Sequence, residues 1–348
     1  MHLEENIPLA PFTTLRIGGP ARFFARITTE AELLEAITFA HRKSLPIFAL
    51  GGGSNLVVPD EGFPGLVLLI NVGNEIRTEQ GLTIVDAGVD WNAFVLRTCQ
   101  QGISGVECLA GIPGLVGGSP IQNIGAYGQE VASTIHSVRA LDLETLDFVT
   151  LAHTNCGFAY RRSVFNSTRR NRYIVTQVSF RFDPNATPNL SYADLRKHFG
   201  AHATPTPLEV YEAVRQIRAA KGMLIDPTDP TPDSRSAGSF FKNPIVPAAA
   251  LTHIAQALSI PEAGIPHWPA SDQIKLSAAW LIERAGFPKG FTFGPVGISS
   301  LHTLALINRT STANCADLLA LRDHIIAHVA SRFGITLEQE PVSLSPTL

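Results

Sequence analysis

Six glycines lie within the segment from Gly111 to Gly128, and no other feature limits the possible folds of this chain as strongly. The segment reads GIPGLVGGSPIQNIGAYG and mixes its glycines with asparagine and glutamine. Backbone without side chains can approach a partner closely, and such a segment is typical of a chain pressed against a flat polar ligand. A ligand site is therefore favoured over a simple connection between two elements.

A second glycine-rich segment, Gly51 to Asn55, directly follows a short apolar run that predicts a strand over Leu45 to Leu50. Consecutive small residues at that place let backbone N–H groups point at a phosphate, although a tight turn between strands would look the same. Neither segment has the pattern G-x-G-x-x-G, and the chain contains no Walker A pattern. A Rossmann dinucleotide site is not supported, so any dinucleotide must be held in another way.

The first 70 residues predict a small α/β unit. Thr29 and Glu32 form a capping box that opens a helix through about Lys43. Strands are expected on both sides of this helix, at Ala21 to Ile27, Leu45 to Leu50, Leu56 to Val58 and Gly65 to Ile70.

The middle of the chain predicts short strands and two helices, and the last third predicts more helices. A helix is expected from Trp91 to Gln101, and a capping box at Thr206 and Glu209, with Pro207 between them, opens the next. The segment from Asp226 to Pro232 (DPTDPTP) predicts a loop or linker. Three further helices are expected at about 247–258, 275–285 and 314–333, and the tail Ile335 to Leu337 is strand-like and returns to the first domain.

Length and composition narrow the class of protein. A chain of 348 residues predicts two or three domains, and a net charge of −3 gives no sign of a nucleic-acid partner. The acidic N-terminus does not resemble a signal peptide, and no apolar run approaches the ~20 residues that span a bilayer. The four cysteines stand far apart without metal-ligand spacing, which predicts buried free thiols, no metal site and a cytoplasmic location.

Three more segments could carry chemistry, and each also has a simpler interpretation. Arg161, beside aromatic residues, could clamp a carboxylate, while Arg169 to Arg172 could form either a nucleic-acid patch or, more commonly, a solvated basic face. Ser239, between a glycine and two phenylalanines, is by itself typical of a packed turn. The carboxylates of Glu338 and Glu340 would normally belong to a frayed, solvated end.

Taken in order, from Pro11 to Glu340, these segments resemble the UDP-N-acetylenolpyruvoylglucosamine reductases, the flavoenzymes that complete UDP-N-acetylmuramate in bacterial peptidoglycan synthesis. The resemblance implies an α+β chain with a VAO/PCMH-like FAD-binding fold of two domains and a third, α/β domain that closes on substrate. The expected domains are residues 1–70 with 335–348, residues 71–222 and residues 223–334.

The resemblance also implies FAD and NADPH as cofactors. The two glycine-rich segments then supply the contacts to the FAD diphosphate and the flavin. The residues expected to bind cofactor are Gly51, Gly52, Gly53, Ser54, Asn55, Gly111, Pro113, Gly117, Gly118, Ser119, Asn123, Gly125 and Ala126.

Three residues match the family's catalytic positions. Hydride addition to the enolpyruvyl double bond leaves negative charge beside the substrate carboxylate, which Arg161 and Glu340 would stabilise. Ser239 matches the proton donor, since a positioned hydroxyl suffices for so strong a base. Glu338 stays open as the alternative to Glu340, and Arg162 and Asn166 stand where the family usually has Asp and Lys.

Four residues match substrate-binding positions. Lys221, Asn243 and His302 correspond to contacts of the UDP diphosphate, and Tyr192 resembles the tyrosine of the longer of the two family subtypes. The implied partners are a UDP-sugar and NADPH, with no nucleic acid or membrane, and the implied state is a monomer.

Two alternatives remain open at this stage. An oxidase of the same fold would often attach its flavin through His or Cys, and the segment from Gly111 to Gly128 has neither. A non-catalytic flavin-binding protein would be expected to lose Ser239, Arg161 or the C-terminal glutamate, and all are present.

Overall fold

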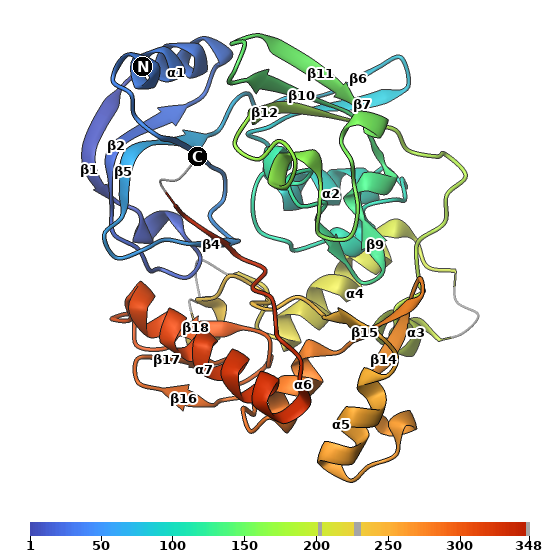
Figure 1. The fold of residues 1–348 in the computed structure, drawn as a ribbon. Coiled ribbons are helices and arrows are strands. Elements are labelled where there is room, and N and C mark those ends of the chain that lie inside the picture. The colour runs from blue at the N-terminus through green and yellow to red at the C-terminus, as the bar shows by residue number, and fades with distance from the viewer. Residues whose placement is uncertain (201–203, 226–230, 346–348) are drawn as a thin grey trace.

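A computed structural model describes residues 1–200, 204–225 and 231–345. The described chain mixes helices with parallel and antiparallel sheets, so the α+β class is confirmed. Figure 1 shows three regions: an N-terminal one in blue, a middle one in green and a C-terminal one in orange and red. Most of the predicted linker, residues 226–230, lies outside the described residues.

The N-terminal region is a small α/β unit, as predicted. Its sheet has the order β1-β2-β5-β3, in which β2, β5 and β3 run parallel and β1 runs antiparallel to β2. The predicted capping box of Thr29 and Glu32 is present and starts α1. The elements are β1 (Leu3–Pro8), β2 (Pro20–Ile27), α1 (Glu30–Arg42), β3 (Ile47–Leu50), β4 (Leu56–Val57) and β5 (Phe63–Ile70).

The middle region is a five-stranded antiparallel sheet with the order β11-β10-β12-β7-β6; α2 lies on one side of it, α4 packs against α2, and α3 packs against α4. The second predicted capping box, Thr206 with Glu209, starts α4 with Pro207 at its first position. The elements are β6 (Ile76–Glu79), β7 (Leu82–Asp86), α2 (Trp91–Gln100), β8 (Gly125–Ala126), β9 (Gln129–Glu130), β10 (Ile135–Asp142), β11 (Phe148–Ala152), β12 (Tyr173–Phe180), α3 (Ala193–Phe199) and α4 (Pro207–Ala220).

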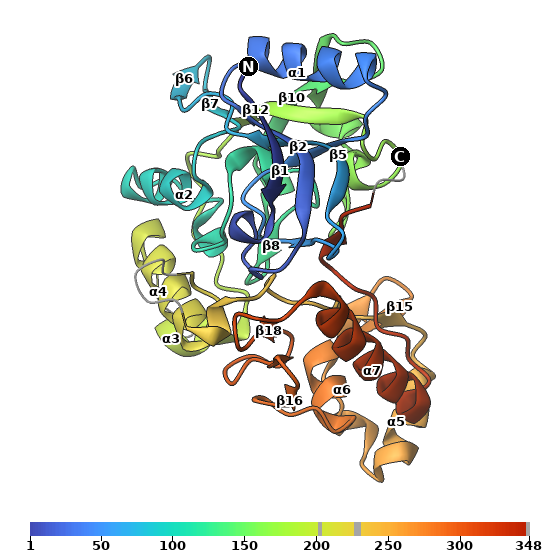
Figure 2. The same cartoon turned by 90° about the vertical axis from the view of Figure 1, so that its left-hand side faces the viewer.

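The C-terminal region packs three helices against two small sheets, β13-β15-β14 and β16-β17-β18. Figure 2 shows α5, α6 and α7 together at the end of the molecule away from the other two regions. The elements are β13 (Ile245–Val246), α5 (Ala250–Leu258), β14 (His267–Ala270), β15 (Gln273–Leu276), α6 (Ala278–Arg284), β16 (Thr292–Phe293), β17 (Val296–Ile298), β18 (Leu306–Asn308), α7 (Cys315–Phe333) and β19 (Val342–Ser343).

For two helices of this region, the predicted first residue lies three residues before the observed one. The helix expected at 275–285 starts at Ala278, because Gln273–Leu276 is strand β15, paired on both edges, and Ser277 caps the helix by accepting from Trp280 N. The helix expected at 247–258 starts at Ala250, after a turn. The helix expected at 314–333 is confirmed as α7, which ends at the left-handed Gly334.

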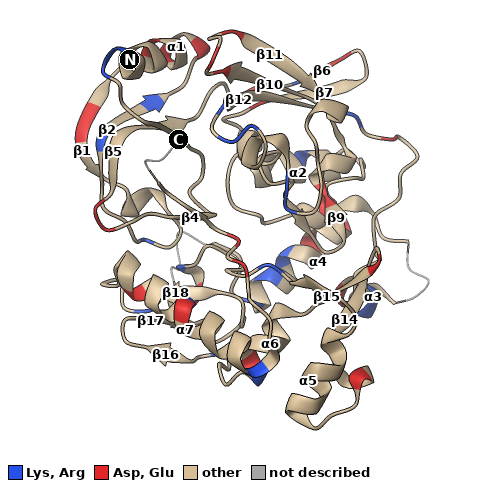
Figure 3. Ribbon diagram, viewed as in Figure 1, with Lys and Arg blue, Asp and Glu red and all other residues tan. Residues whose placement is uncertain are grey.

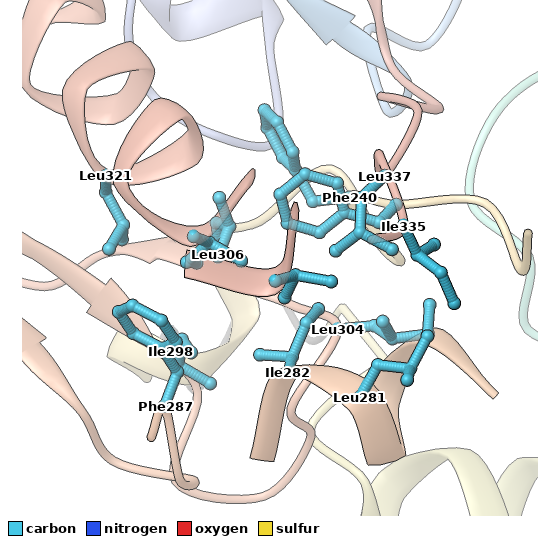
Figure 4. Packing of buried hydrophobic residues seen from close by; sticks show 14 of the residues in the cluster. Phe240, Leu281, Ile282, Phe287, Ile298, Leu304, Leu306, Leu321, Ile335 and Leu337 are labelled. Carbon is cyan, nitrogen blue, oxygen red and sulfur yellow. The ribbon is translucent and has the colours of Figure 1, made fainter. Parts of the chain in front are cut away.

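The strand predicted at Ile335–Leu337 is wrong. Ile335 and Leu337 are buried in the C-terminal hydrophobic cluster beside Phe240, as Figure 4 shows, and they pair with no strand. The return to the N-terminal region comes later, where β19 runs parallel to β4. Burial against the C-terminal core has overridden the strand-like pattern. We keep the three-domain division as a proposal, with residues 335–337 packed on the third domain.

The N-terminal and C-terminal regions share one core. Leu15, Ile17 and Val57 belong to the same buried cluster as the apolar face of α7. The Asn308 side chain donates to the carbonyl of Leu15 at 3.2 Å, and Asp60 accepts from the first backbone N–H groups of α7 at 2.6 and 3.0 Å. The C-terminal region is therefore fixed to the N-terminal sheet by packing and by a helix cap.

The four cysteines are buried free thiols, as predicted, and burial raises the pKa of Cys99 to about 12.

Figure 3 shows acidic and basic residues distributed over all three regions. In the possible basic patch, Arg172 is paired with Asp142 at 2.8 Å and with Glu144 at 2.7 Å, so much of its charge is compensated. Within residues 1–200, 204–225 and 231–345, no helix is long and apolar enough to cross a membrane.

Truncating Leu15 tests the shared core. Leu15 is 1% exposed, so Leu15→Ala should lower the free energy of unfolding by about 2–5 kcal/mol through lost burial and an unfilled cavity. Urea titration followed by circular dichroism measures the change. Ile245→Ala, at a residue 44% exposed, is the control and should stay within about 0.5 kcal/mol of the unsubstituted protein. Equal stabilities for both variants would contradict a shared core.

Candidate functional site

A cavity of about 1130 Å³ is lined by residues of all three regions. Both glycine-rich segments border it, together with the Tyr160–Arg161 turn, the end of α4 and the C-terminal tail. Sixteen of the residues predicted for the site line it: Ser239, Arg161, Glu340, Gly51, Gly52, Ser54, Asn55, Pro113, Gly118, Ser119, Gly125, Ala126, Tyr192, Lys221, Asn243 and His302.

Four predicted cofactor-binding residues are not among the described residues that line the cavity: Gly53, Gly111, Gly117 and Asn123. Gly53 has φ +62°, and a Cβ there would lie 1.9 Å from the carbonyl oxygen of Phe12. The Asn123 side chain donates to Glu130 and to the carbonyl of Ala159, and it accepts from the N–H of Ala132. These residues shape the loops behind the cavity, and a direct contact with cofactor stays a prediction.

The two glycine-rich segments touch each other at the cavity wall. A Cβ on Gly52 would lie 2.6 Å from the Cα of Gly114, which only a glycine permits. Ser54 Oγ donates to the carbonyl of Pro113 at 3.0 Å, and Asn55 Nδ2 donates to Gln122 Oε1 at 2.6 Å. The two segments therefore form one continuous wall.

One polar atom in this wall has no partner. Ser119 is 1% exposed, and its hydroxyl makes no hydrogen bond within the described part of the chain. Buried polar groups are nearly always satisfied, so such an atom points to a ligand group or an ordered water. The wall thus offers both close backbone approach and a free hydroxyl.

Arg161 projects from a strained two-residue turn. Ala159 and Arg162 exchange backbone hydrogen bonds at 2.9 and 3.0 Å, which places Tyr160 and Arg161 at the tip. Arg161 has φ +54°, an unusual conformation for a residue with a long side chain. Its Nη1 donates to the carbonyl of Gly125 at 2.8 Å, so the turn is held against the second glycine-rich segment. Strain of this kind persists where surrounding contacts impose it, often at functional sites.

Arg161 forms a close ion pair with Glu340. Nε lies 3.0 Å from Glu340 Oε1, and the two side chains are 21% and 10% exposed. The N–H on Nε does not point at that oxygen and has no hydrogen-bond partner among the described residues. Burial raises the pKa of Glu340, against the opposing influence of Arg161 and Lys242. The pair therefore keeps one donor free and a carboxyl that holds its proton more readily than usual.

Glu338, the alternative to Glu340, faces solvent instead. Its side chain is 72% exposed and pairs with Lys242 outside the cavity. The Glu340 side chain, by contrast, is 10% exposed and lines the cavity. The geometry places Glu340 in the site and Glu338 on the surface.

Ser239 lies at the cavity, on a turn fixed by two buried phenylalanines. Phe240 and Phe241 are 0% and 1% exposed, and Figure 4 shows Phe240 packed beside Ile335 and Leu337. Phe240 N donates to the carbonyl of Leu304 at 2.7 Å, and Glu340 N donates to the carbonyl of Phe240 at 2.9 Å. The packed turn expected from the sequence is present, and it presents Ser239 to the cavity beside Glu340.

The predicted substrate residues gather at the end of α4. Lys221 Nζ lies 2.7 Å from Asp194 Oδ2 and 5.6 Å from the centre of the Tyr127 ring. The Tyr192 ring meets the Tyr127 ring edge to face at 5.2 Å. Burial, and then the positive charge of Lys221, lower the pKa of His302 to about 4, so this histidine is neutral near pH 7.

Asn243 also lines the cavity, and it links the site to the C-terminal region. Its Oδ1 accepts from the N–H of Ala278, the first residue of α6, at 2.9 Å. The same side chain thus caps a helix and borders the site.

Tyr127 and Arg218 are among the cavity residues that the sequence predictions missed, and both had a signal. Tyr127 ends the glycine-rich segment with φ +49°, rare for a bulky residue. Arg218 follows Val210 and Val214 at intervals of four, which places a charged side chain on the buried face of α4. An arginine at such a position is a candidate for a functional role.

Comparisons with known proteins agree with this arrangement. Residues 21–146 match the model of the FAD binding domain, and residues 229–344 match that of the UDP-N-acetylenolpyruvoylglucosamine reductase C-terminal domain. The chain is 46% identical to the Thermobifida fusca UDP-N-acetylenolpyruvoylglucosamine reductase, over 99% of this chain and 98% of that protein. It is 43% identical to the Streptomyces coelicolor enzyme of that name, over 99% and 91% of the two chains.

A solved structure shows the same fold. The UDP-N-acetylenolpyruvylglucosamine reductase of Thermus caldophilus superposes with a TM-score of 0.66 at 26% identity, covering 99% of this chain and 100% of that chain. Fold and domain matches together define a flavoprotein with an FAD-binding fold and an additional C-terminal domain. Within that class, the chain belongs to the UDP-N-acetylenolpyruvoylglucosamine reductase family.

The residues present fit FAD. The two glycine-rich segments leave backbone uncovered by side chains at the cavity. The hydroxyl of Ser119 is buried and has no hydrogen-bond partner among the described residues. A large dinucleotide with a diphosphate needs close backbone approach and polar donors of this kind.

Adding a methyl group at Gly52 tests the cofactor wall. In Gly52→Ala the new Cβ would collide with the backbone of Gly114, push the two segments apart and weaken FAD binding about tenfold or more. Visible flavin absorbance of the purified protein, with titration of added FAD, measures the effect. Gly264→Ala, where a Cβ meets nothing within 4 Å, should keep its flavin. Full FAD retention in both variants would contradict the assignment of this wall.

Proposed function

We propose that the protein reduces UDP-N-acetylglucosamine enolpyruvate to UDP-N-acetylmuramate, with FAD as bound cofactor and NADPH as reductant. The observation that carries this proposal is that Ser239, Arg161 and Glu340 line the same cavity as the two glycine-rich segments. FAD, when bound, supplies the hydride chemistry, and the protein supplies binding, orientation and charge.

Arg161 and Glu340 would act on the substrate carboxylate. The free Nε–H of Arg161 and its positive charge suit an anion that enters the cavity. Burial raises the pKa of Glu340, so its carboxyl takes up a proton more readily than an exposed glutamate does, and the protonated form would donate to the same group. Both would stabilise negative charge that spreads onto the carboxylate during the reaction, and loss of one such donor typically costs ~10²–10³ in rate.

Ser239 would give its hydroxyl proton to the carbon next to the substrate carboxylate. A serine is a weak acid, but the enolate-like carbon is a strong base, so position decides whether transfer occurs. The buried Phe240 and the backbone bond from Glu340 to Phe240 fix that position. Ser239 then has a role only after hydride has added to the neighbouring methylene carbon of the double bond.

The end of α4 would hold the UDP part of the substrate. Lys221 supplies charge, and Asn243 and the neutral His302 supply hydrogen bonds. Tyr192 lines the cavity and contacts Tyr127, which supports a substrate-binding role, and its match to the family's tyrosine is the reason that we assign the chain to the longer subtype. We keep the cytoplasmic location, the monomeric state and closure of the third domain as parts of this proposal.

A reductase is favoured over the two alternatives left open by the sequence. The relatives at 46% and 43% identity are reductases by name over almost the whole chain, whereas an oxidase or a non-catalytic flavin protein would share the fold alone.

Removing the Ser239 hydroxyl tests the proton donor. In Ser239→Ala, NADPH should still reduce the flavin at the normal rate, while reoxidation by the enolpyruvyl sugar nucleotide slows by about 10² or more. Stopped-flow absorbance measures the two half-reactions separately. Ser133→Ala is the matched control: its hydroxyl donates to the carbonyl of Glu130, and Ser133 is not among the described residues that line the cavity. Normal rates in both half-reactions of Ser239→Ala would refute the proton-donor role.

The pH dependence tests Glu340. Because burial raises its pKa, the carboxyl keeps its proton to a higher pH than an exposed glutamate, and the second half-reaction should slow as pH rises through that pKa. Glu340→Gln keeps a donor that cannot titrate, so this alkaline decline should disappear. The same alkaline decline in enzyme and variant would assign it to another group.

A further inference from the structure

Arg218 is a buried cation with no role in the binding and proton-transfer steps proposed above. It lies on the buried face of α4, is 6% exposed as a residue, and borders the cavity. Its Nε donates to the carbonyl of Gly111 at 3.1 Å and its Nη2 to the carbonyl of Met223 at 3.0 Å. One guanidinium thus joins the start of the second glycine-rich segment to the chain that follows α4.

No carboxylate compensates this charge within the described part of the chain. The ion pairs there include none to Arg218. Burial lowers the pKa of Arg218, and only the Tyr127 phenol, a neutral group near pH 7, acts in the opposite direction. A buried charge without a partner is strongly unfavourable, so an anion in the cavity is expected to complete it.

The neighbours of Arg218 show where that anion would bind. Lys221 follows one turn later, and the positive charges of Lys221 and Arg218 both contribute to the lowered pKa of His302. Of the two cations, Lys221 alone has a carboxylate partner, the half-exposed Asp194. Figure 3 shows the basic residues of α4 in blue toward the end of the helix that lies near the middle of the molecule. The end of α4 is therefore a positively charged patch facing the cavity.

We propose that Arg218 binds a phosphate group of the sugar nucleotide and, through Gly111 and Tyr127, couples that phosphate to the flavin-binding segment. This rests on the proposed function. The FAD diphosphate is a second source of the same chemistry, but Lys221 and His302, which match UDP-binding positions, lie near Arg218 and favour the sugar nucleotide. A planar, two-pronged donor suits a phosphate better than a point charge does.

The test compares UDP with uridine, two probes that differ in their phosphates. Calorimetric titration of the FAD-loaded protein gives both dissociation constants. Arg218→Met should weaken UDP binding about 10- to 100-fold, because a charged hydrogen-bonded contact is lost, and uridine binding less than about threefold. Arg218→Lys keeps the positive charge but loses the planar guanidinium, so its dissociation constant for UDP should lie between those of the unsubstituted protein and Arg218→Met.

Arg215→Met is the matched control. Arg215 precedes Arg218 by three residues on α4, bonds to the Tyr211 hydroxyl at 3.3 Å and does not line the cavity. Its UDP and uridine constants should both be unchanged. If Arg218→Met does not fold, the ratio of the UDP and uridine constants is measured in Arg218→Lys.

Three results would overturn the proposal. Equal weakening of UDP and uridine would show that Arg218 only maintains the fold. Unchanged UDP binding would show that the phosphate is held elsewhere, and loss of FAD with normal UDP binding would assign the charge to the cofactor. Failure of the proposed function is distinct, because an unsubstituted protein that does not reduce the enolpyruvyl sugar nucleotide can still show the UDP effect.

Discussion

The site depends on the pairing of one short C-terminal segment with two distant parts of the chain. Glu340 N donates to the carbonyl of Phe240 and Lys242 N to that of Glu338, which sets Glu340 next to Ser239. Two residues later Val342 N donates to the carbonyl of Asn55, at the end of the first glycine-rich segment. These backbone bonds bring the C-terminal region, with its serine and glutamate, against the wall that would hold FAD. Without them, the proposed catalytic groups and the proposed cofactor wall would lie on separate regions of the chain.

Near these backbone pairings, the cavity contains several polar groups that have no hydrogen-bond partner or counter-ion among the described residues. Arg161 has an unpaired Nε–H on a strained turn, Ser119 has an unpaired hydroxyl, and Arg218 has no counter-ion among the described residues. Each is unfavourable in the free protein and would be relieved by an anionic ligand. Binding energy from the cofactor and substrate would therefore offset structural costs already present.

Local chemistry predicted much of this structure, and long-range packing decided the rest. The capping boxes at Thr29 and Thr206 and the two glycine-rich segments have short-range causes, so the sequence alone located them. Choosing Glu340 over Glu338 depends on the register of the tail against Phe240, about a hundred residues away, and no local pattern carries it. The strand expected at Ile335–Leu337 failed for the same reason, because the C-terminal core covers residues whose alternation looked strand-like.

A crystal structure with FAD and the enolpyruvyl sugar nucleotide is the most direct measurement of the account. The account predicts the substrate carboxylate on Arg161 Nε and Glu340, and Ser239 Oγ within about 3–3.5 Å of the adjacent carbon, the distance of a productive approach. The flavin would lie against the paired glycine-rich segments. A carboxylate bound elsewhere, with the Ser239 hydroxyl out of reach of that carbon, would contradict it.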